Sequence, residues 1–573
     1  MNRVGKNDWP FIVIRHDMGV NDAPDVFAAL MECHARHPGA CDEFWFATGS
    51  RKTIPALEKE VATFARYRSL CEKHGILLGY QQGMTLGHGA RHDGRWSGPE
   101  EQPFPDDAWQ VGRDGARLPF LCPRSPDVLS YEREYAKTVM RVARPSSYWL
   151  DDDLRLGISK PDGCFCDRCI TAFNAINGGA WTREALVAAL DGLEASSAAL
   201  RSAWCAFNAE SLAIYAAAVR DAADAIVPPC RLGYQAVSAN RIYTALDYAP
   251  LLTSLSGSGR ATVGIRPGHG FYAEAEPRGM VAKCLAVARE AERCRALEGK
   301  AADPCVASVC YEEENYPRRA LKKSPGAIVT ECALALASGC DSLSLYWFSA
   351  TSGESVEEYD LFLAAISAAR PYFERLAAST RRTRLGGLAR LVGPHPAPDY
   401  DRYDQTDFHL ACAGIPITVA GPATSAYYRT EKSLAEGAGE AAPKPMVALP
   451  ELGEYPAGPD RAAFLDELDT VTDGTFPVRV DALRALRILP RILPQSGGMV
   501  DSVTVLNLSI GRTGPVSLRI RNPASTVALY QSPEMDAPGP IPSTFRSGGH
   551  VPELLVTLPN LAPWQIATVF LAQ

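Results

Sequence analysis

The sequence lacks features that would place the chain in or on a membrane. No apolar stretch approaches the roughly 20 residues that cross a bilayer, and the run Phe11–Ile14 is too short for the core of a secretion signal. The formal net charge of -8 argues against a nucleic-acid or anionic-membrane surface. Walker motifs and dinucleotide fingerprints are also missing, and the run Pro267–Gly270 is too weak a pattern to indicate phosphate binding. We therefore expect a cytoplasmic protein without nucleic-acid or membrane partners.

Cysteine is missing from the last 161 residues, because all 16 cysteines lie at or before Cys412. Most occur in apolar helical or strand-like contexts, which is typical of reduced core residues. The exception is Cys164, Cys166 and Cys169, which place three soft metal ligands within six residues. Tetrahedral zinc needs four ligands, and Cys122 is the best candidate for the fourth. Four thiolates leave no open position, so this pattern predicts a structural zinc; packing cysteines or an adventitious site are the alternative.

Short apolar runs alternate with amphipathic helical patterns over the first 350 residues. Eight βα units in this length predict a TIM barrel of the α/β class, and an open doubly wound sheet is the alternative. The apolar runs are Phe11–His16, Glu43–Thr48, Ile76–Gln81, Ser147–Asp151, Arg231–Val237, Thr262–Arg266, Val306–Tyr311 and Ser342–Phe348. The helix candidates between them include Ile54–His74, Val128–Val142, Ala198–Ile226, Arg278–Leu297, Gly326–Ser338 and Glu357–Ala377.

The chain is too long for one core, and its character changes after about residue 385. Leu388–Val392 and Ile415–Val419 indicate strands of a small α/β domain, and Ser502–Gln573 alternates with period two between Pro and Gly residues. We therefore expect a barrel over residues 1–384, a small flavodoxin-like α/β domain over residues 385–497 and an antiparallel β-sandwich over residues 498–573.

Three aspartates, Asp151, Asp152 and Asp153, directly follow the fourth apolar run. This is the carboxyl end of a predicted barrel strand, where TIM-barrel active sites lie. Strand alternation would turn Asp151 and Asp153 to one face and Asp152 to the other. Crowding like charges costs stability and shifts pKa values, which favours a function for at least one of them. The alternative is a cap for the following turn or a pairing site for Arg155.

A second acidic cluster, Glu312 to Glu314, follows the seventh apolar run, and alternation gives Glu312 and Glu314 the same direction. Strands four and seven of a barrel face each other across its mouth, so the two clusters could flank a bound sugar. Two carboxyl groups about 5 Å apart perform retaining glycoside hydrolysis, and a wider gap admits water for inversion. A solvated acidic loop is the alternative.

Rings and polar groups at other strand ends suit a polyhydroxylated substrate. Arg15, Gln81 and Arg266 are weaker candidates of this kind. Our candidate substrate-binding residues are Arg117, Asp152, Gln235, His269, Tyr346 and Trp347.

The segment Leu121–Pro126, the amphipathic helix after it, the run Trp149–Asp153 and the motif Cys164–Cys169 together resemble the core of the glycoside hydrolase family 42 β-galactosidases. Gly339–Asp341 leading to Tyr346 and Trp347 is also similar to the eighth strand of that family. The resemblance implies a barrel, a small α/β domain involved in trimerisation and a C-terminal β-domain. It also implies that the zinc ligands are Cys122, Cys164, Cys166 and Cys169.

The resemblance places Asp153 at the acid/base position and Asp152 at a preceding asparagine position. The nucleophile position matches Glu312 by register or Glu314 by its distance to Pro317, and we prefer Glu312. The family's Asn-Glu pair is Asp-Asp in this chain. An aspartate at position 152 can only accept a hydrogen bond when ionised, and Asp153 is one methylene shorter than glutamate. These departures indicate altered sugar specificity.

The sequence thus predicts an exo-acting, retaining glycoside hydrolase that forms a homo-oligomer, with a trimer implied by the resemblance. Asp153 and Glu312 are the expected catalytic pair, with Asp151, Asp152 and Glu314 as alternatives. A catalytically silent sugar-binding barrel is one other hypothesis. A hydrolase or lyase that holds Mg²⁺ or Mn²⁺ in its Asp and Glu clusters is another.

Overall fold

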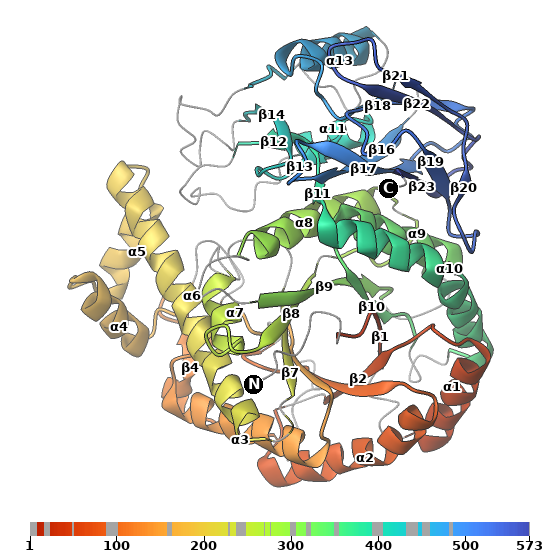
Figure 1. Ribbon diagram of the computed structural model, residues 1–573. Helices are drawn as coiled ribbons and strands as arrows, with labels where there is room; N and C mark the ends of the chain where they lie inside the picture. Colours follow the sequence, from red (N-terminus) through yellow and green to blue (C-terminus); the bar gives the residue numbers. More distant parts are fainter. Residues whose placement is uncertain are drawn as a thin grey trace.

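A computed structural model of the protein describes residues 9–16, 23–48, 51–87, 101–156, 163–226, 228, 230–236, 248–268, 270–275, 277–297, 305–316, 322–348, 354–391, 405–430, 445–449, 459–480 and 485–571. Eight parallel strands close into a barrel in the order β1-β10-β9-β8-β7-β6-β3-β2 (Figure 1). The barrel closes because β1 pairs with both β2 and β10, so the doubly wound alternative is wrong and the TIM barrel is confirmed.

Each barrel strand coincides with one of the eight apolar runs. The strands are β1 (Ile12–Arg15), β2 (Glu43–Thr48), β3 (Leu77–Gln82), β6 (Ser147–Leu150), β7 (Arg231–Ala236), β8 (Thr262–Pro267), β9 (Cys305–Glu314) and β10 (Ser342–Tyr346). Both faces of such strands are covered, one by the barrel interior and one by helices, which is why they are continuously apolar rather than alternating.

Helices surround the barrel in Figure 1. They are α1 (Pro24–Arg36), α2 (Ile54–Lys73), α3 (Pro126–Val142), α6 (Ala195–Asp224), α7 (Ala249–Leu255), α8 (Pro277–Ala296), α9 (Pro325–Ser338) and α10 (Val356–Arg382). The start of α9 shows why a helix begins where it does. The Ser324 hydroxyl caps it by accepting a hydrogen bond from the Ala327 backbone N–H, and Pro325 occupies the first turn.

Tryptophans fill the lower part of the barrel interior, and glycines make room for them. Trp45 and Trp149 are buried with their ring centroids 4.5 Å apart. A Cβ atom on Gly233 would lie 2.3 Å from the Trp149 ring, and one on Gly264 would lie 2.5 Å from it. Among the described residues, these rings fill the barrel below the carboxyl ends of its strands, which is the face where TIM-barrel active sites lie.

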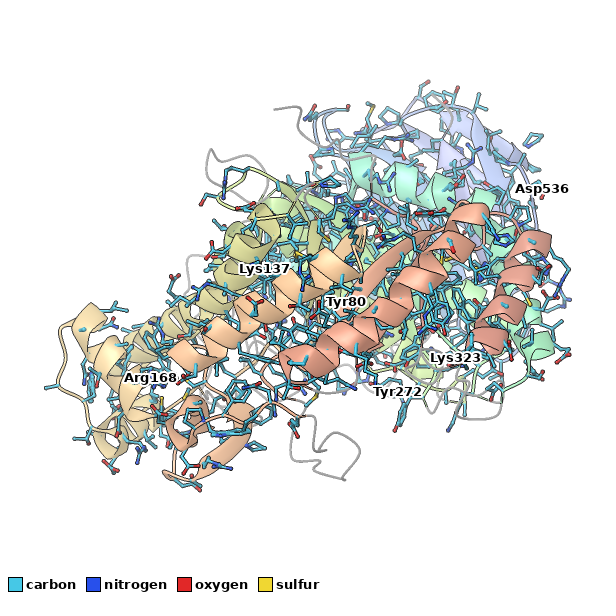
Figure 2. All side chains as sticks on the ribbon, turned by 90° about the horizontal axis from the view of Figure 1, so that it is seen from below. Tyr80, Lys137, Arg168, Tyr272, Lys323 and Asp536 are labelled. Carbon is cyan, nitrogen blue, oxygen red and sulfur yellow. The ribbon has the colours of Figure 1, made fainter. Side chains whose placement is uncertain are left out.

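An excursion leaves the barrel beside α3 and α6. It contains the helical turn η3 (Asp106–Ala108), the hairpin β4 (Trp109–Val111) and β5 (Arg117–Leu121), and the helices α4 (Asp167–Asn177) and α5 (Arg183–Asp191). In Figure 1, α4 and α5 protrude from the body of the molecule, and Arg168 on α4 marks this end in Figure 2.

A small three-stranded parallel sheet, β13-β12-β14, follows the barrel. Its strands are β12 (Gly387–Arg390), β13 (Ile417–Thr418) and β14 (Thr424–Tyr428), with α11 (Thr406–Cys412) and α13 (Pro459–Val471). Arg289 of α8 forms an ion pair with Asp407 of α11, and the Arg278 guanidinium lies 5.1 Å from the Phe408 ring centroid. These contacts fix the small sheet to the outside of the barrel.

The C-terminal part forms two antiparallel sheets, which agrees with the predicted sandwich. One sheet has the order β11-β16-β17-β23-β19-β20 and the other β15-β18-β22-β21. The strands are β11 (Arg384–Leu385), β15 (Val478–Val480), β16 (Leu486–Leu493), β17 (Met499–Asn507), β18 (Val516–Arg521), β19 (Ala528–Gln531), β20 (Gly539–Pro540), β21 (Ser543–Arg546), β22 (Glu553–Leu558) and β23 (Ile566–Leu571). The sheets thus include strands from before residue 498, where we placed the start of the sandwich.

The long helix α10 joins the barrel to the six-stranded sheet. Tyr372 shares a hydrogen bond of 2.8 Å with the Thr568 hydroxyl, and Ser379 donates to the Asp501 carboxylate at 2.7 Å. Arg491 donates to the backbone oxygen of Thr380 at 3.1 Å. No helix among the described residues is long and apolar enough to cross a membrane.

Candidate active site and cysteine cluster

Polar side chains form a layer above the tryptophans, at the carboxyl ends of the barrel strands. Arg15 of β1 donates through Nε to Gln81 Oε1 of β3 at 2.9 Å, across the intervening strand β2. The same guanidinium lies 4.7 Å from the Tyr346 ring centroid of β10. β3 is separated from β1 by β2, and β10 lies on the other side of β1. A side chain of β1 can contact residues of both strands only from the inside of the barrel, so these side chains meet in the barrel mouth.

Glu312 of β9 lies at the centre of this layer and is only 8% exposed. Arg15 Nη1 donates to its Oε1 at 2.8 Å, and Arg266 of β8 forms an ion pair with the same oxygen. Arg266 Nη2 also lies 3.7 Å from Asp151 Oδ1. Burial, together with the charge of Arg15, lowers the pKa of Arg266 to about 10. The Arg266 guanidinium is still cationic near neutral pH, and together with Arg15 it stabilises the negative charge of the Glu312 carboxylate.

The aspartates occupy a turn rather than the end of a strand. β6 stops at Leu150, and the backbone N–H groups of Leu154 and Arg155 donate to the oxygens of Asp151 and Asp153. The alternation that we predicted for the three side chains therefore does not continue beyond the strand. Asp153 is completely buried, whereas Asp151 and Asp152 are partly exposed.

Asp152 has an unusual environment for a carboxyl group. Burial raises its pKa from 3.8 to about 6, and the negative charge of the neighbouring Asp151 adds to this effect. The positive charges of Arg155 and Arg266 oppose the shift without cancelling it. A carboxyl group with a pKa of about 6 is protonated half of the time at pH 6 and roughly a tenth of the time at pH 7, far more often than an ordinary aspartate, and this favours a role as general acid.

Tyr272 lies in the segment after β8, and the charges that shift its pKa show which charged groups lie near one another at the mouth. Its pKa is raised by burial, by Glu314 and by Asp152, while the charges of Arg266 and Arg15 oppose the shift. Carboxylates from the β6 and β9 ends therefore act on one phenol, which is 46% exposed. The Glu274 backbone N–H, two residues after Tyr272, donates to the backbone oxygen of Lys322, so the segment of Tyr272 lies beside the segment of Lys323 (Figure 2).

Strand alternation holds along β9 and separates the three glutamates. Glu313 points outward, where Lys323 Nζ lies 2.9 Å from its Oε1, and its neighbour Tyr311 donates to Glu331 of α9. Glu312 points inward and Glu314, two residues later, is partly exposed at the mouth. The outward position of Glu313 leaves Glu312 and Glu314 as the two glutamates of the mouth.

The predicted substrate-binding residues fall into different parts of the structure. Gln235 is completely buried on β7, and neither polar atom of its amide has a partner among the described residues. Tyr346 lies against Arg15 at the mouth. Trp347 instead stacks on Tyr359 and Phe362 of α10, with ring centroids 5.5 and 5.7 Å apart, so it belongs to the layer between barrel and helices.

One further predicted contact, Arg117, does not join this group. Arg117 lies on the β4–β5 hairpin, where it forms an ion pair of 2.7 Å with Asp106 and stacks on Trp109. His269 lies outside the described residues. Tyr272 was not predicted, since a tyrosine in a loop has no spacing signal. Arg15 and Arg266 were only weak candidates, because sequence does not show that their charges meet on Glu312.

The four cysteines that the motif singled out form one cluster. Cys122 follows β5, Cys166 is the N-cap of α4, and all four side chains are buried. The ligand atoms of Cys122, Cys164, Cys166 and Cys169 lie within 4.8 Å of one another. Cys122 Sγ lies 3.8 Å from Cys166 Sγ and 3.6 Å from Cys169 Sγ.

These distances fit a tetrahedral metal. Zinc–sulfur bonds of about 2.3 Å at tetrahedral angles place the sulfurs about 3.8 Å apart. Hydrogen bonds from Cys122 and the other thiols hold the pKa of Cys166 well below its usual range. The cluster joins two insertions of the barrel, which are the β4–β5 hairpin before α3 and the segment around α4 after β6, since Cys122 comes from the first and the other three cysteines from the second. A backbone hydrogen bond also connects them, from the Phe165 N–H to the Val111 oxygen at 2.8 Å. Among the described residues, no group of three or more Asp and Glu side chains has its carboxylate oxygens close enough together to hold a metal ion.

The sequence itself matches no family model and no curated protein. The fold, in contrast, is similar to solved structures over nearly the whole chain. A β-galactosidase from Bacillus circulans sp. alkalophilus aligns with a TM-score of 0.59 and 10% identity, covering 98% of this chain and 99% of the other. A catalytic mutant of a GH42 β-galactosidase from G. stearothermophilus aligns with a TM-score of 0.56 and 11% identity, covering 99% of each chain.

A third structure, the cold-adapted β-galactosidase from Rahnella sp. R3, aligns with a TM-score of 0.52 and 13% identity over 98% of each chain. Identities this low show the fold alone. The chain therefore has, from end to end, the fold of the family 42 β-galactosidases.

Proposed function

We propose that the protein is an exo-acting glycoside hydrolase with a two-carboxylate mechanism. The observation that carries the proposal is the meeting of Asp152, Glu312, Arg15 and Arg266 in one barrel mouth. One carboxyl group there has a raised pKa and the other is held by two guanidinium groups. Two carboxyl groups whose environments push them to opposite protonation states are the requirement of glycosidic bond cleavage.

Glu312 is the proposed nucleophile of a retaining reaction. Its carboxylate would attack the anomeric carbon, and the ion pairs with Arg15 and Arg266 orient it. Gly268 allows the backbone to lie close to this group, since a Cβ atom there would come within 2.9 Å of Glu312 Oε2. Glu314, which acts on Tyr272 beside Asp152, is the alternative nucleophile.

Asp152 is the proposed proton donor to the leaving oxygen. We favour it over Asp153, the position that the resemblance implies, because Asp153 is completely buried and Asp152 is partly exposed. Asp151 and Asp153 then act by raising the pKa of Asp152, since both negative charges disfavour its ionised form.

The glycone is proposed to lie on the polar layer of the barrel. The amide of Gln235 has two buried polar atoms that need partners, and sugar hydroxyl groups can both donate to it and accept from it. Tyr346 and Tyr272 offer rings for the apolar faces of a sugar. The rings that fill the barrel below the mouth suit cleavage of a terminal sugar from short glycosides.

The cysteine cluster is proposed to hold a structural zinc ion through Cys122, Cys164, Cys166 and Cys169. When bound, the ion would fix the two insertions to each other, and four thiolates leave no position for substrate. We also propose a cytoplasmic homotrimer, following the resemblance to family 42. Light scattering should then give three times the chain mass of 61.9 kDa, and a mass of one chain would exclude the trimer.

The roles of Asp152 and Asp153 can be separated by the leaving group. Loss of the general acid lowers kcat/KM for alkyl glycosides by roughly 10² to 10⁴. For dinitrophenyl glycosides kcat/KM should be spared, because dinitrophenolate leaves without a proton, whereas kcat falls because the same residue is the base of the second, hydrolytic step. We expect this selective loss in Asp152→Asn, and a smaller, leaving-group-independent change in Asp153→Asn. The opposite pattern would return the acid role to Asp153.

A further inference from the structure

A closed cluster of charges lies behind the proposed nucleophile. Lys283 of α8, Glu313 of β9, Glu331 of α9 and Lys323, which lies just before α9, are all completely buried. Two positive and two negative side chains make the cluster neutral. Buried charges are costly unless each one is paired and hydrogen-bonded, so a cluster of this kind needs a reason to persist.

The partners within the cluster are well defined. Lys323 Nζ lies 2.9 Å from Glu313 Oε1 and 2.6 Å from Glu331 Oε2. Glu331 Oε1 accepts from the Tyr311 hydroxyl at 2.7 Å and lies 3.4 Å from Lys283 Nζ. The Lys283 ammonium also lies 4.7 Å from the Tyr311 ring centroid. The two lysines are therefore joined through Glu331.

Both lysines also hold the backbone of the mouth. Lys283 Nζ donates to the backbone oxygen of Glu312, and Lys323 Nζ donates to the backbone oxygen of Glu314 at 2.9 Å. The register of β8 with β9 ends at Val309, whereas β10 pairs with β9 as far as Glu314. The last residues of β9 thus have a strand neighbour on one side only, and the ammonium groups are attached to this part of the strand.

We propose that Lys283 and Lys323 are positioning residues, which fix the end of β9 and thereby the direction of the Glu312 and Glu314 carboxylates. The kinetic part of this inference rests on the proposed function. The backbone part does not, because it concerns only the order of the strand end. A displacement of about 1 Å at a reacting group can cost about 100-fold in rate, which is the effect expected when this support is removed.

The test uses a charge-balanced variant, Lys323→Met with Glu313→Gln, because Lys323→Met alone leaves two buried carboxylates with one lysine. The matched control is Arg295→Met, which removes a buried partner of Asp341 3.4 Å away, beside the start of β10. The two readouts are hydrogen exchange of the amides of residues 311–316 in the full-length protein, and kcat and KM on any glycoside that the wild type cleaves.

We expect the double variant to fold, to exchange these amides at least about 10-fold faster and to lose about 100-fold in kcat with little change in KM. Arg295→Met should change neither exchange at this segment nor kcat. Wild-type exchange in a folded double variant would overturn the inference, and so would unchanged kcat. If the wild type cleaves no glycoside, the proposed function fails, while the exchange result still decides whether the lysines hold the strand.

Discussion

Glu132 of α3 should make the stability of the protein fall as the pH rises from 5 to 8. This carboxyl group is 1% exposed, and burial raises its pKa from 4.5 to about 7. Its Oε2 accepts hydrogen bonds from Tyr215 and, at 2.9 Å, from Gln82 of β3. These bonds favour the ionised form, but they do not offset the effect of burial.

The sign follows from linkage. The folded-state pKa lies above the unfolded value of 4.5, so the folded state binds more protons between these values. The contribution to stability is complete below about pH 4.5 and is lost as the pH rises through 7. A shift of about 2.5 units, at 1.36 kcal/mol per unit, corresponds to about 3.4 kcal/mol in total. About 2.5 kcal/mol of this should be lost between pH 5 and pH 8.

The assay compares the urea unfolding of wild type and Glu132→Gln at the two pH values. Glutamine keeps an oxygen acceptor for Tyr215 and Gln82 but does not titrate, so the difference between the two proteins isolates this group. We expect the wild type to lose about 2.5 kcal/mol more than the variant does. The reasoning is refuted if Glu132→Gln shows the same pH dependence as the wild type.

Three further outcomes follow from the structure. Metal analysis of the purified protein should find about one zinc ion per chain, and Cys166→Ser should lose it whereas the buried Cys71→Ser should keep it; zinc retained in both would exclude the cluster as its site. Gly233→Ala should lower the free energy of unfolding by about 1–3 kcal/mol or more, because the new Cβ meets the Trp149 ring at 2.3 Å, and an unchanged unfolding midpoint would show that the ring can move. If Asp152 is the acid, kcat/KM should fall tenfold per pH unit above about pH 6, and a profile flat to pH 8 would argue against that role.

The barrel could be predicted from the sequence because its signal is repeated. Eight apolar runs of strand length alternate with helices, and each run coincides with a strand. The cysteine cluster was equally accessible, since the spacing of Cys164, Cys166 and Cys169 leaves few alternatives to a shared site. Alternation along β9 also correctly gave Glu312 and Glu314 one direction, because the strand continues through Glu314.

The same rule failed for the aspartates, since β6 ends at Leu150 and the backbone turns. Asp152 and Asp153 then differ in exposure, since Asp153 is completely buried and Asp152 is partly exposed. This difference depends on the packing of the whole loop and is not visible in the spacing of the residues. The surroundings of Trp347 were not visible in the sequence for a similar reason: it follows the last residue of β10, and its ring stacks on Tyr359 of α10.

The buried lysines illustrate a further limit. Lys283 lies on a helix that carries several other charged residues, and nothing in its sequence context distinguishes a buried ammonium from a solvated one. Its partner Glu331 lies in an otherwise apolar helix, which is the one local hint of a buried charge. The pairing itself is a tertiary property, because residues from two helices and one strand meet only after the barrel has closed.

The measurement that tests the central claim most directly is turnover of a broad panel of aryl α- and β-glycosides, pyranosides and furanosides, by wild type and Glu312→Gln. The account predicts that the wild type cleaves at least one sugar and that Glu312→Gln, which removes the charge held by Arg15 and Arg266, loses this activity by several orders of magnitude. A panel left untouched by the folded wild type, or full activity in Glu312→Gln, would contradict it.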